Sequence, residues 1–268
     1  MSGSVIHSQS AAMVPAVYSA GQSAQLPVAI DYQAALALRQ MSMVHDELPK
    51  YLLAPEVSAL LHYVPDLRRK MLLATLWNTG ARINEALALT RGNFSLAPPY
   101  PFVQLATLKQ RTEKAARTAG RTPAGQQTHR LVPLSDSWYV SQLQTMVATL
   151  KIPMERRNKR TGRTEKARIW EVTDRTVRTW IGEAVAAAAA DGVTFSVPVT
   201  PHTFRHSYAM HMLYAGIPLK VLQSLMGHKS ISSTEVYTKV FALDVAARHR
   251  VQFAMPESDA VAMLKQLS

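Results

Sequence analysis

The stretch 200–240, TPHTFRHSYAMHMLYAGIPLKVLQSLMGHKSISSTEVYTKV, constrains this chain more than any other segment. Thr200 followed by Pro201 is a typical helix start, because Thr caps the first turn and Pro fits the first helical position. Gly216 and Gly227 follow helical segments and are typical of helix ends. The pattern therefore predicts three short helices joined by tight turns.

The candidate site residues on these helices supply one guanidinium, two imidazoles and a phenol: Arg205, His202, His228 and Tyr237. His202 and Arg205 are three residues apart in a first helical turn, so they share a face beside free backbone N–H groups, as in a phosphate site. Tyr237 has an ordinary phenol pKa near ~10 and needs a base or a cationic field to act as a nucleophile. His202 and His228 could supply the base, and Arg205 could supply the field. This combination suits cleavage of a phosphodiester.

Each of these residues also has a simpler structural explanation. His202 and Arg205 could belong to an exposed capping turn, His228 could cap a helix end, and Tyr237 could be an ordinary amphipathic tyrosine. His202 and His206 have the i, i+4 spacing of a metal-binding pair. Zinc would need a third ligand, however, and the intervening Arg205 would repel the cation, so a metal is only weakly indicated.

Composition limits the class of protein. The chain has 268 residues, of which 47% are hydrophobic, enough for one large domain or one domain plus a small one. It contains no cysteine, so neither a disulfide framework nor a thiolate site is expected. The absence of a bilayer-length apolar run and of a signal-peptide pattern predicts a cytoplasmic protein.

The charge points to a polyanionic partner. The formal net charge is +12 and the isoelectric point is about 10.1, which favours nucleic acid first and an anionic membrane second. The first basic run holds Lys109, Arg111, Lys114, Arg117, Arg121 and Arg130. The second holds Lys151, Arg156, Arg157, Lys159, Arg160, Arg163, Lys166 and Arg168. Neither run has an amphipathic apolar face, which disfavours a membrane and leaves DNA as the better partner.

The remaining pattern predicts a mainly α fold with a small antiparallel sheet. The predicted strands are 93–96, 102–108 and 130–134. The connection 110–128 is far longer than the ~2–5 residues of an ordinary hairpin, and 153–167 is predicted to be a second basic loop. Residues 1–49 are predicted to be a flexible arm with at most a short helix, 50–255 a catalytic domain, and 256–268 a tail helix.

A further arginine lies far upstream, in the segment TGARINEAL. Arg82 is predicted to begin a short helix directly after the helix stop at Gly80. Glu85 follows one turn later and could hydrogen-bond or orient Arg82.

The boxes TGARINEAL, HTFRHSYA and LMGHKSISSTEVYTKV resemble those of the tyrosine recombinase (phage integrase) family. The resemblance covers about residues 50 to 245 and implies the fold of that family's catalytic domain. It places the set Arg82, His202, Arg205, His228 and Tyr237 in the order that the family uses.

The resemblance implies a role for each residue of the set. Tyr237 would attack a DNA phosphodiester and form a 3′-phosphotyrosine, while Arg82 and Arg205 would clamp the non-bridging oxygens. His202 would assist proton transfer from the phenol, and His228 would hydrogen-bond the phosphate.

The resemblance also implies a lysine that protonates the leaving 5′-oxygen. Lys109 fits best, with Lys114 as its rival because the connection is long. Glu85 would support Arg82. No ATP, metal or other cofactor is expected, since the covalent link keeps the bond energy. The implied partners are double-stranded DNA with paired recombination sites and further copies of the chain, in a tetramer.

Two features depart from the family's pattern. Many members carry a separate N-terminal core-binding domain, and residues 1–49 are too few for it. The basic loops 110–128 and 151–168 could therefore supply part of the grip on DNA, including Arg111, Arg117 and Arg121 in the first and Arg156, Arg157, Lys159, Arg160 and Arg163 in the second. The tail helix 259–267 could dock on its own core or insert into a neighbouring subunit.

Three functions remain open from the sequence. The first is a site-specific recombinase that resolves plasmid multimers or cointegrates. The second is a catalytically silent DNA-binding relative, which the completeness of the set disfavours. The third is a topoisomerase that relaxes DNA by the same cleavage, which the compact size disfavours.

Overall fold

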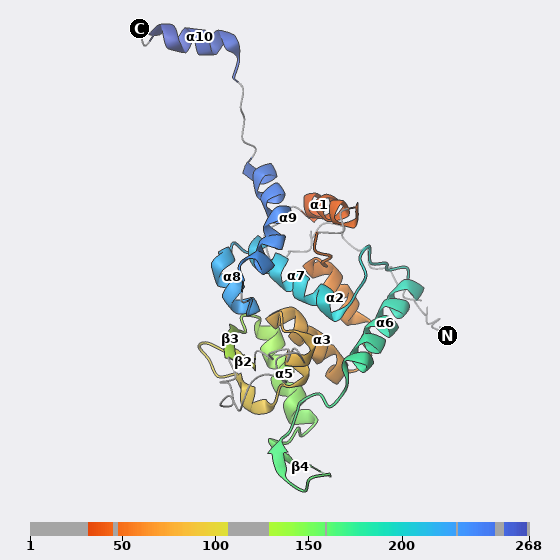
Figure 1. The fold of residues 1–268 in the computed structure, drawn as a ribbon. Coiled ribbons are helices and arrows are strands. Elements are labelled where there is room, and N and C mark those ends of the chain that lie inside the picture. The colour runs from red at the N-terminus through yellow and green to blue at the C-terminus, as the bar shows by residue number, and fades with distance from the viewer. Residues whose placement is uncertain are drawn as a thin grey trace, which may run out of the picture.

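A computed structural model describes most of the chain (Figure 1). It covers residues 32–44, 48–106, 129–158, 160–228, 230–249 and 255–266. Six basic residues assigned to the site from the sequence lie outside these ranges: Lys109, Arg111, Lys114, Arg117, Arg121 and Lys159. The choice of Lys109 over Lys114 therefore stays a prediction.

The predicted fold class, mainly α with a small antiparallel sheet, is confirmed. The helices are α1 (Tyr32–Val44), α2 (Ala54–His62), α3 (Leu67–Thr79), α4 (Ile83–Leu87), the 3-10 helix η1 (Arg91–Asn93), α5 (Ser137–Thr149), α6 (Asp174–Ala190), α7 (Pro201–Tyr214), α8 (Leu219–Met226), α9 (Ser232–His249) and α10 (Glu257–Gln266). The strands are β1 (Phe94–Ser95), β2 (Phe102–Ala106), β3 (His129–Pro133), β4 (Glu155–Arg157) and β5 (Thr164–Lys166).

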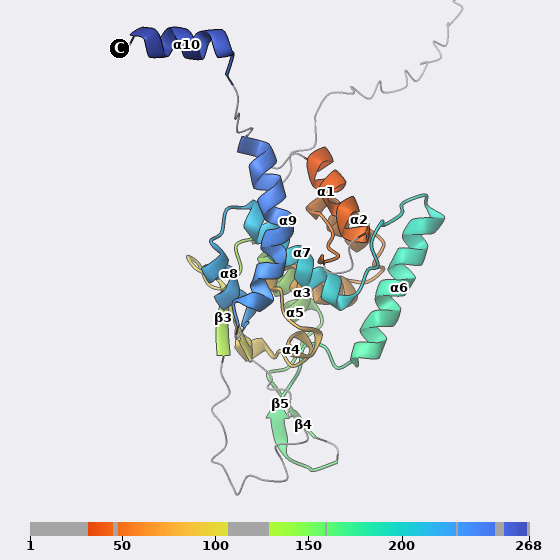
Figure 2. The ribbon, with the colours of Figure 1, turned by 45° about the horizontal axis from the view of Figure 1, so that its top comes forward.

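Helix α7 lies at the centre of the body, where it packs against α3, α8 and α9 (Figures 1 and 2). Its start follows the sequence pattern, because the Thr200 side chain accepts a hydrogen bond from the Thr203 amide at 3.2 Å and Pro201 occupies the first turn. Most of its side chains are buried, including the polar Arg205 and Ser207. A central helix with buried polar groups must satisfy them internally, which makes α7 a rigid support for a site.

The three-stranded sheet has the order β1-β2-β3 and is antiparallel throughout. Val103 and Leu105 of β2 face the core, as does Val132 of β3. Arg130 stands on the same buried face of β3, opposite Leu105 in the register. Alternation in a strand normally places an apolar residue at such a position, so this inward charge needs a buried partner.

The prediction of a second basic loop over 153–167 is wrong. This segment forms the antiparallel hairpin β4–β5, with Arg156 paired to Glu165 in the register. The Arg156 guanidinium also contacts Glu165 across the hairpin at 2.8 Å and Glu171, beyond β5, at 2.5 Å, so ion pairs stabilise strands that lack an apolar face. The hairpin projects from the body at the end away from α9 (Figures 1 and 2).

The C-terminal part differs from the expected boundaries. Helix α9 runs past the predicted end at 240, because no Gly or Pro follows before Pro256. In both views α10 lies away from the body, with Val261 51% and Leu264 67% exposed. Docking of this helix on its own core is therefore not seen. No helix in the described ranges has the length and apolar character needed to cross a bilayer.

Helix α1 is the one N-terminal element of the described residues, and it packs against α9. Arg39 is 3% exposed; it forms an ion pair with Glu56 of α2 and donates to the Ser196 hydroxyl at 2.7 Å. This buried arginine ties α1 to the body, whereas the sequence had predicted only a flexible arm with at most a short helix.

Candidate active site

Arg205 is the most firmly held group of the predicted site. It is 3% exposed, and its guanidinium donates to the carbonyl oxygens of Gly80 and, at 2.6 Å, Met226. Burial, with the charges of Arg82 and Arg130, lowers the pKa of Arg205 to about 10, which still leaves it charged at neutral pH. The side chain thus joins the end of α3 to the end of α8 from the first turn of α7.

Gly80 permits this joining because of its conformation and its size. It ends α3 in the left-handed region with φ 58°. A Cβ atom at this position would lie 2.4 Å from Cδ1 of Tyr208 on α7. Only a glycine allows α3 and α7 to approach so closely and directs the chain into Arg82.

Arg82 and Glu85 are in contact, as the resemblance implied. The Arg82 amide donates to the Glu85 carboxylate at 2.9 Å, and its guanidinium does so at 3.0 Å. The Glu85 side chain is 1% exposed, whereas that of Arg82 is 43% exposed. The carboxylate therefore holds the Arg82 backbone and one guanidinium nitrogen, while the rest of the guanidinium still reaches solvent, where a phosphate could bind.

A third arginine, Arg130, completes this cluster and was counted in the sequence only as part of a basic run. It forms a two-pronged ion pair with Glu85, at 2.6 and 3.1 Å. Burial favours a raised pKa for Glu85, but hydrogen bonds and charge from Arg130 and Arg82 outweigh it and lower the pKa of this carboxyl. Glu85 thus stays ionised between two arginines.

His228 lies directly after the end of α8. Gly227 closes that helix in the left-handed region with φ 62°, and the His228 amide then donates to the Gln223 carbonyl at 3.1 Å. Nδ1 of His228 lies 2.8 Å from the Thr234 hydroxyl of α9. Burial and the nearby arginine charges lower the pKa of His228 to about 4, so the ring is neutral at pH 7.

Tyr237 of α9 is buried, at 2% exposed. Its hydroxyl lies 2.9 Å from Nδ1 of His206. Burial raises the pKa of Tyr237 to about 12, even though the charges of Arg205 and Arg82 favour the phenolate. The phenol is thus protonated at neutral pH and must lose its proton to act as a nucleophile.

The residue next to the phenol is His206, whereas the resemblance assigned proton transfer to His202. His202 is exposed, and its ring packs edge-to-face on the His206 ring with the ring centroids 4.8 Å apart. Burial, with repulsion from His202 and Arg205, lowers the pKa of His206 to about 4. A neutral imidazole beside the phenol can accept its proton. Sequence reasoning considered His206 only as half of a metal pair, and its position four residues after His202 was the available signal.

The structure thus brings five of the predicted residues into one cluster: Arg82, His202, Arg205, His228 and Tyr237. Both halves of the chain contribute, because Arg205 donates to the carbonyls of Gly80, two residues before Arg82, and of Met226, two residues before His228. A cavity of about 350 Å³ opens beside His202 and His206. Across the described ranges, no group of three His, Cys, Asp or Glu is placed to hold a metal ion.

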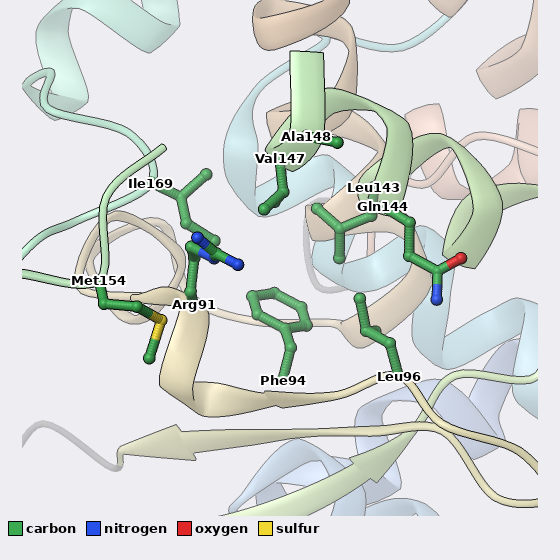
Figure 3. Close-up of a pocket in the computed structure, with 9 residues that line it drawn as sticks. All are labelled: Arg91, Phe94, Leu96, Leu143, Gln144, Val147, Ala148, Met154 and Ile169. Carbon is green, nitrogen blue, oxygen red and sulfur yellow. The ribbon is translucent and has the colours of Figure 1, made fainter. Parts of the chain in front are cut away.

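A second pocket, of about 350 Å³, lies apart from this cluster between β1, α5 and the chain before β4 (Figure 3). Its walls are mainly apolar, and Phe94 and Leu96 of the β1 segment face Leu143 and Val147 of α5 (Figure 3). None of the predicted catalytic residues lines it, so we do not assign it to the active site.

The fold and this cluster define a catalytic domain of the integrase type. The fold is similar to that of a solved XerA recombinase, with a TM-score of 0.54 and 20% identity over 77% of this chain and 65% of that one. A Tn1549 transposon integrase in complex with circular intermediate DNA is similar with a TM-score of 0.52 and 20% identity, over 85% of this chain and 71% of that one.

Residues 50–243 match the model of the phage integrase family, and the chain belongs to this family. It is 97% identical, over all 268 residues of both chains, to a protein named resolvase from Escherichia coli (strain K12). It is also 46% identical over 257 residues, 95% of this chain and 97% of the relative, to a probable site-specific recombinase in the afa region of Escherichia coli. The predicted enzyme class, a tyrosine site-specific recombinase, is confirmed.

Proposed function

We propose that this chain cuts and rejoins DNA through a covalent bond between Tyr237 and a 3′-phosphate. The observation that carries the proposal is the buried phenol, 2.9 Å from the His206 imidazole and within the field of Arg205 and Arg82. A base and two cations are what a phenol needs to attack a phosphodiester at neutral pH.

The steps of the proposed reaction balance in atoms and charge. The Tyr237 oxygen attacks phosphorus as its proton passes to a neighbouring imidazole, and the bond from phosphorus to the 5′-oxygen breaks. Arg82 and Arg205 offset the negative charge that gathers on the non-bridging oxygens, while His228 donates to one of them. The leaving 5′-oxygen takes a proton, which we assign to Lys109. Attack by a 5′-hydroxyl from a partner strand reverses these steps.

We further propose that four copies assemble on paired DNA sites in the cytoplasm and resolve plasmid multimers or cointegrates. The near-identical relative is named a resolvase, which supports this role. A structure of XerH recombinase is similar in fold over 80% of this chain and 54% of that one, with a TM-score of 0.50 and 17% identity. That structure contains the difH substrate DNA of XerH. The division into an arm at 1–49, a catalytic domain at 50–255 and a tail at 256–268 belongs to the same proposal.

The test is to trap the covalent intermediate. A duplex library with a nick beside each candidate cleavage position lets the short fragment with the free 5′-hydroxyl diffuse away, so a cleaving enzyme accumulates as an adduct that survives denaturation. Sequencing the attached DNA ends fixes both the target and the polarity of the link. Retention of specific DNA without any adduct would indicate a silent binding protein, and relaxation of plasmids that lack the site would indicate a topoisomerase.

The two histidines can be separated by two measurements. We expect His206→Asn to raise nitration of Tyr237 in the DNA-free protein, because the imidazole next to the phenol is lost, and to slow adduct formation by about 10²-fold. His202→Asn should slow cleavage while leaving nitration unchanged, since the ring hydrogen-bonded to the phenol is that of His206. Peptide mass spectrometry reports nitration at Tyr237 alone. Equal nitration of the two variants would contradict the assignment.

The projecting hairpin is proposed to grip the DNA backbone. Arg160 and Arg163 lie at its exposed turn, whereas Arg156 is already engaged by Glu165 and Glu171. The double variant Arg160→Gln, Arg163→Gln should bind DNA with a weaker salt dependence. In a plot of the logarithm of the DNA-binding constant against the logarithm of salt concentration, we expect the slope to fall in magnitude by about 1.8, that is ~0.9 for each lost phosphate contact. Arg156→Gln is the matched control and should leave the slope nearly unchanged. Identical slopes for the double variant and the wild type would rule out this grip.

A further inference from the structure

We propose that Arg130 is a positioning residue that couples the two halves of the active site. Nothing in the family resemblance assigned it a role, and its side chain is buried. It would act through Glu85 on Arg82 and through the end of α8 on His228. The inference rests on the proposed function, because it concerns the geometry of the same cleavage reaction.

The location of Arg130 shows that its charge serves the interior. Its side chain is 7% exposed and points from β3 toward the core, where Val132 and Leu105 are its strand neighbours. A buried guanidinium is costly unless each of its donors finds an acceptor. All three guanidinium nitrogens of Arg130 donate to acceptors within 3.1 Å, and these acceptors belong to two different parts of the site.

The first acceptor is the Glu85 carboxylate, which is also the support of Arg82. Glu85 receives two bonds from Arg130 and two from Arg82, so its four acceptor positions are shared equally between them. Without Arg130, the nearly inaccessible carboxylate would be left with Arg82 as its cation in this cluster. Arg82 would then turn inward to neutralise Glu85, and its exposed edge would be withdrawn from a bound phosphate.

The second acceptor is the carbonyl oxygen of Leu225, which accepts from Nε of Arg130 at 2.8 Å. The next carbonyl, that of Met226, accepts from Arg205. The last carbonyls of a helix lack intrahelical partners, so these two arginines satisfy the end of α8. A Cβ atom on Gly227 would lie 3.0 Å from Nη1 of Arg130, so the guanidinium packs closely against the glycine turn that presents His228.

The sequence contained a signal for this residue, although it was not recognised. The alternation in HRLVP places Arg130 and Val132 on one face of the strand, against Leu131 and Pro133 on the other. When the apolar face of a sheet strand includes an arginine, a buried carboxylate must be sought elsewhere in the chain. Glu85 is that carboxylate.

The test compares cleavage of two substrates by Arg130→Lys. One is the duplex whose cleavage position has been mapped from trapped adducts, and the other is the same duplex with a neutral methylphosphonate at that position. We expect about 10²-fold slower single-turnover cleavage of the phosphodiester, as for a catalytic group displaced by ~1 Å. Arg130→Lys should cleave the methylphosphonate nearly as fast as the wild type cleaves it, because this neutral group leaves less negative charge for Arg82 to offset. DNA affinity should stay within about threefold of wild type, since the Arg130 side chain is buried.

Two more variants keep the inference falsifiable. In an Arg82→Ala background, Arg130→Lys should add less slowing than it does alone, because the part of its effect that passes through Arg82 is already lost. If Arg130→Lys does not fold, Glu85→Gln with Arg130→Gln removes both buried charges, so Arg82 has no carboxylate to turn toward and this variant should cleave the phosphodiester faster than Arg82→Ala does. Equal slowing of Arg130→Lys on both substrates, slowing that multiplies fully with Arg82→Ala, or a double-Gln variant no faster than Arg82→Ala would overturn the inference alone. Failure of the wild-type chain to form any adduct would instead overturn the proposed function, and the inference with it.

Discussion

Tyr237→Phe is expected to abolish the covalent protein–DNA adduct. Adduct formation in a single-turnover assay should fall by at least about 10⁴-fold, as expected when a catalytic nucleophile is deleted. The ring still fills its buried position, and only the hydroxyl with its 2.9 Å contact to His206 is lost. Affinity for the mapped duplex should therefore stay within about threefold of wild type, because the phenol lies below the surface.

A second buried tyrosine provides a matched control. Tyr139 of α5 is fully buried, and its hydroxyl lies 2.8 Å from the Thr75 hydroxyl. Tyr139→Phe likewise removes one buried hydroxyl with one partner, so it should cost about 1 kcal/mol of unfolding free energy and leave the adduct intact. If Tyr237→Phe still formed the adduct, or if Tyr139→Phe lost it equally, Tyr237 could not be the nucleophile.

Local sequence rules were sufficient to predict the parts of this fold that depend on where helices begin and end. Gly80 and Gly227 both end helices in the left-handed conformation, and the residues after them, Arg82 and His228, are thereby placed at the site. Thr200 caps α7 as the sequence indicated. These signals act within one helical turn, so they can be recognised without knowing the fold.

The contacts that required tertiary packing could not be deduced in the same way. His206 and Tyr237 are 31 residues apart, and only the packing of α7 against α9 brings the imidazole to the phenol. Arg130 and Glu85 are 45 residues apart and meet because β3 faces the start of α4. Helical spacing showed which residues share a face of one helix, but it did not show which face meets which partner.

The basic hairpin illustrates a different limit. Its strands are short, polar and nearly without apolar side chains, so neither alternation nor strand propensity marks them. They are held by backbone pairing and by the ion pairs of Arg156 with Glu165 and Glu171. The charge of this segment alone identified it as a DNA-binding candidate. The structure now separates Arg156, which is held in ion pairs, from Arg160 and Arg163, which are exposed at the turn.

Arg205→Lys is expected to cause the second large loss of cleavage activity. It should lower both the rate of DNA cleavage and the free energy of unfolding. Lysine keeps the charge but cannot donate to the Gly80 and Met226 carbonyls and still present a flat two-donor edge to a phosphate. Cleavage should slow by about 10²–10³-fold, as when one preorganised donor to a developing negative charge is removed. At least one buried carbonyl loses its partner, which should lower the unfolding free energy by about 1–3 kcal/mol.

Arg82→Lys separates the two effects, because Arg82 has the same proposed role but a far more exposed side chain. The Arg82 side chain is 43% exposed, and its ion pair with Glu85 is backed by Arg130. We therefore expect a similar loss of cleavage rate with a change in unfolding free energy of at most about 1 kcal/mol. Thermal unfolding and single-turnover cleavage of both variants give the comparison. A stable Arg205→Lys that cleaves at the wild-type rate would show that neither the carbonyl contacts nor the two-donor edge matters. Slow cleavage by both variants, with a loss of stability only in Arg205→Lys, would show that one arginine serves the fold and the reaction together while the other serves the reaction alone.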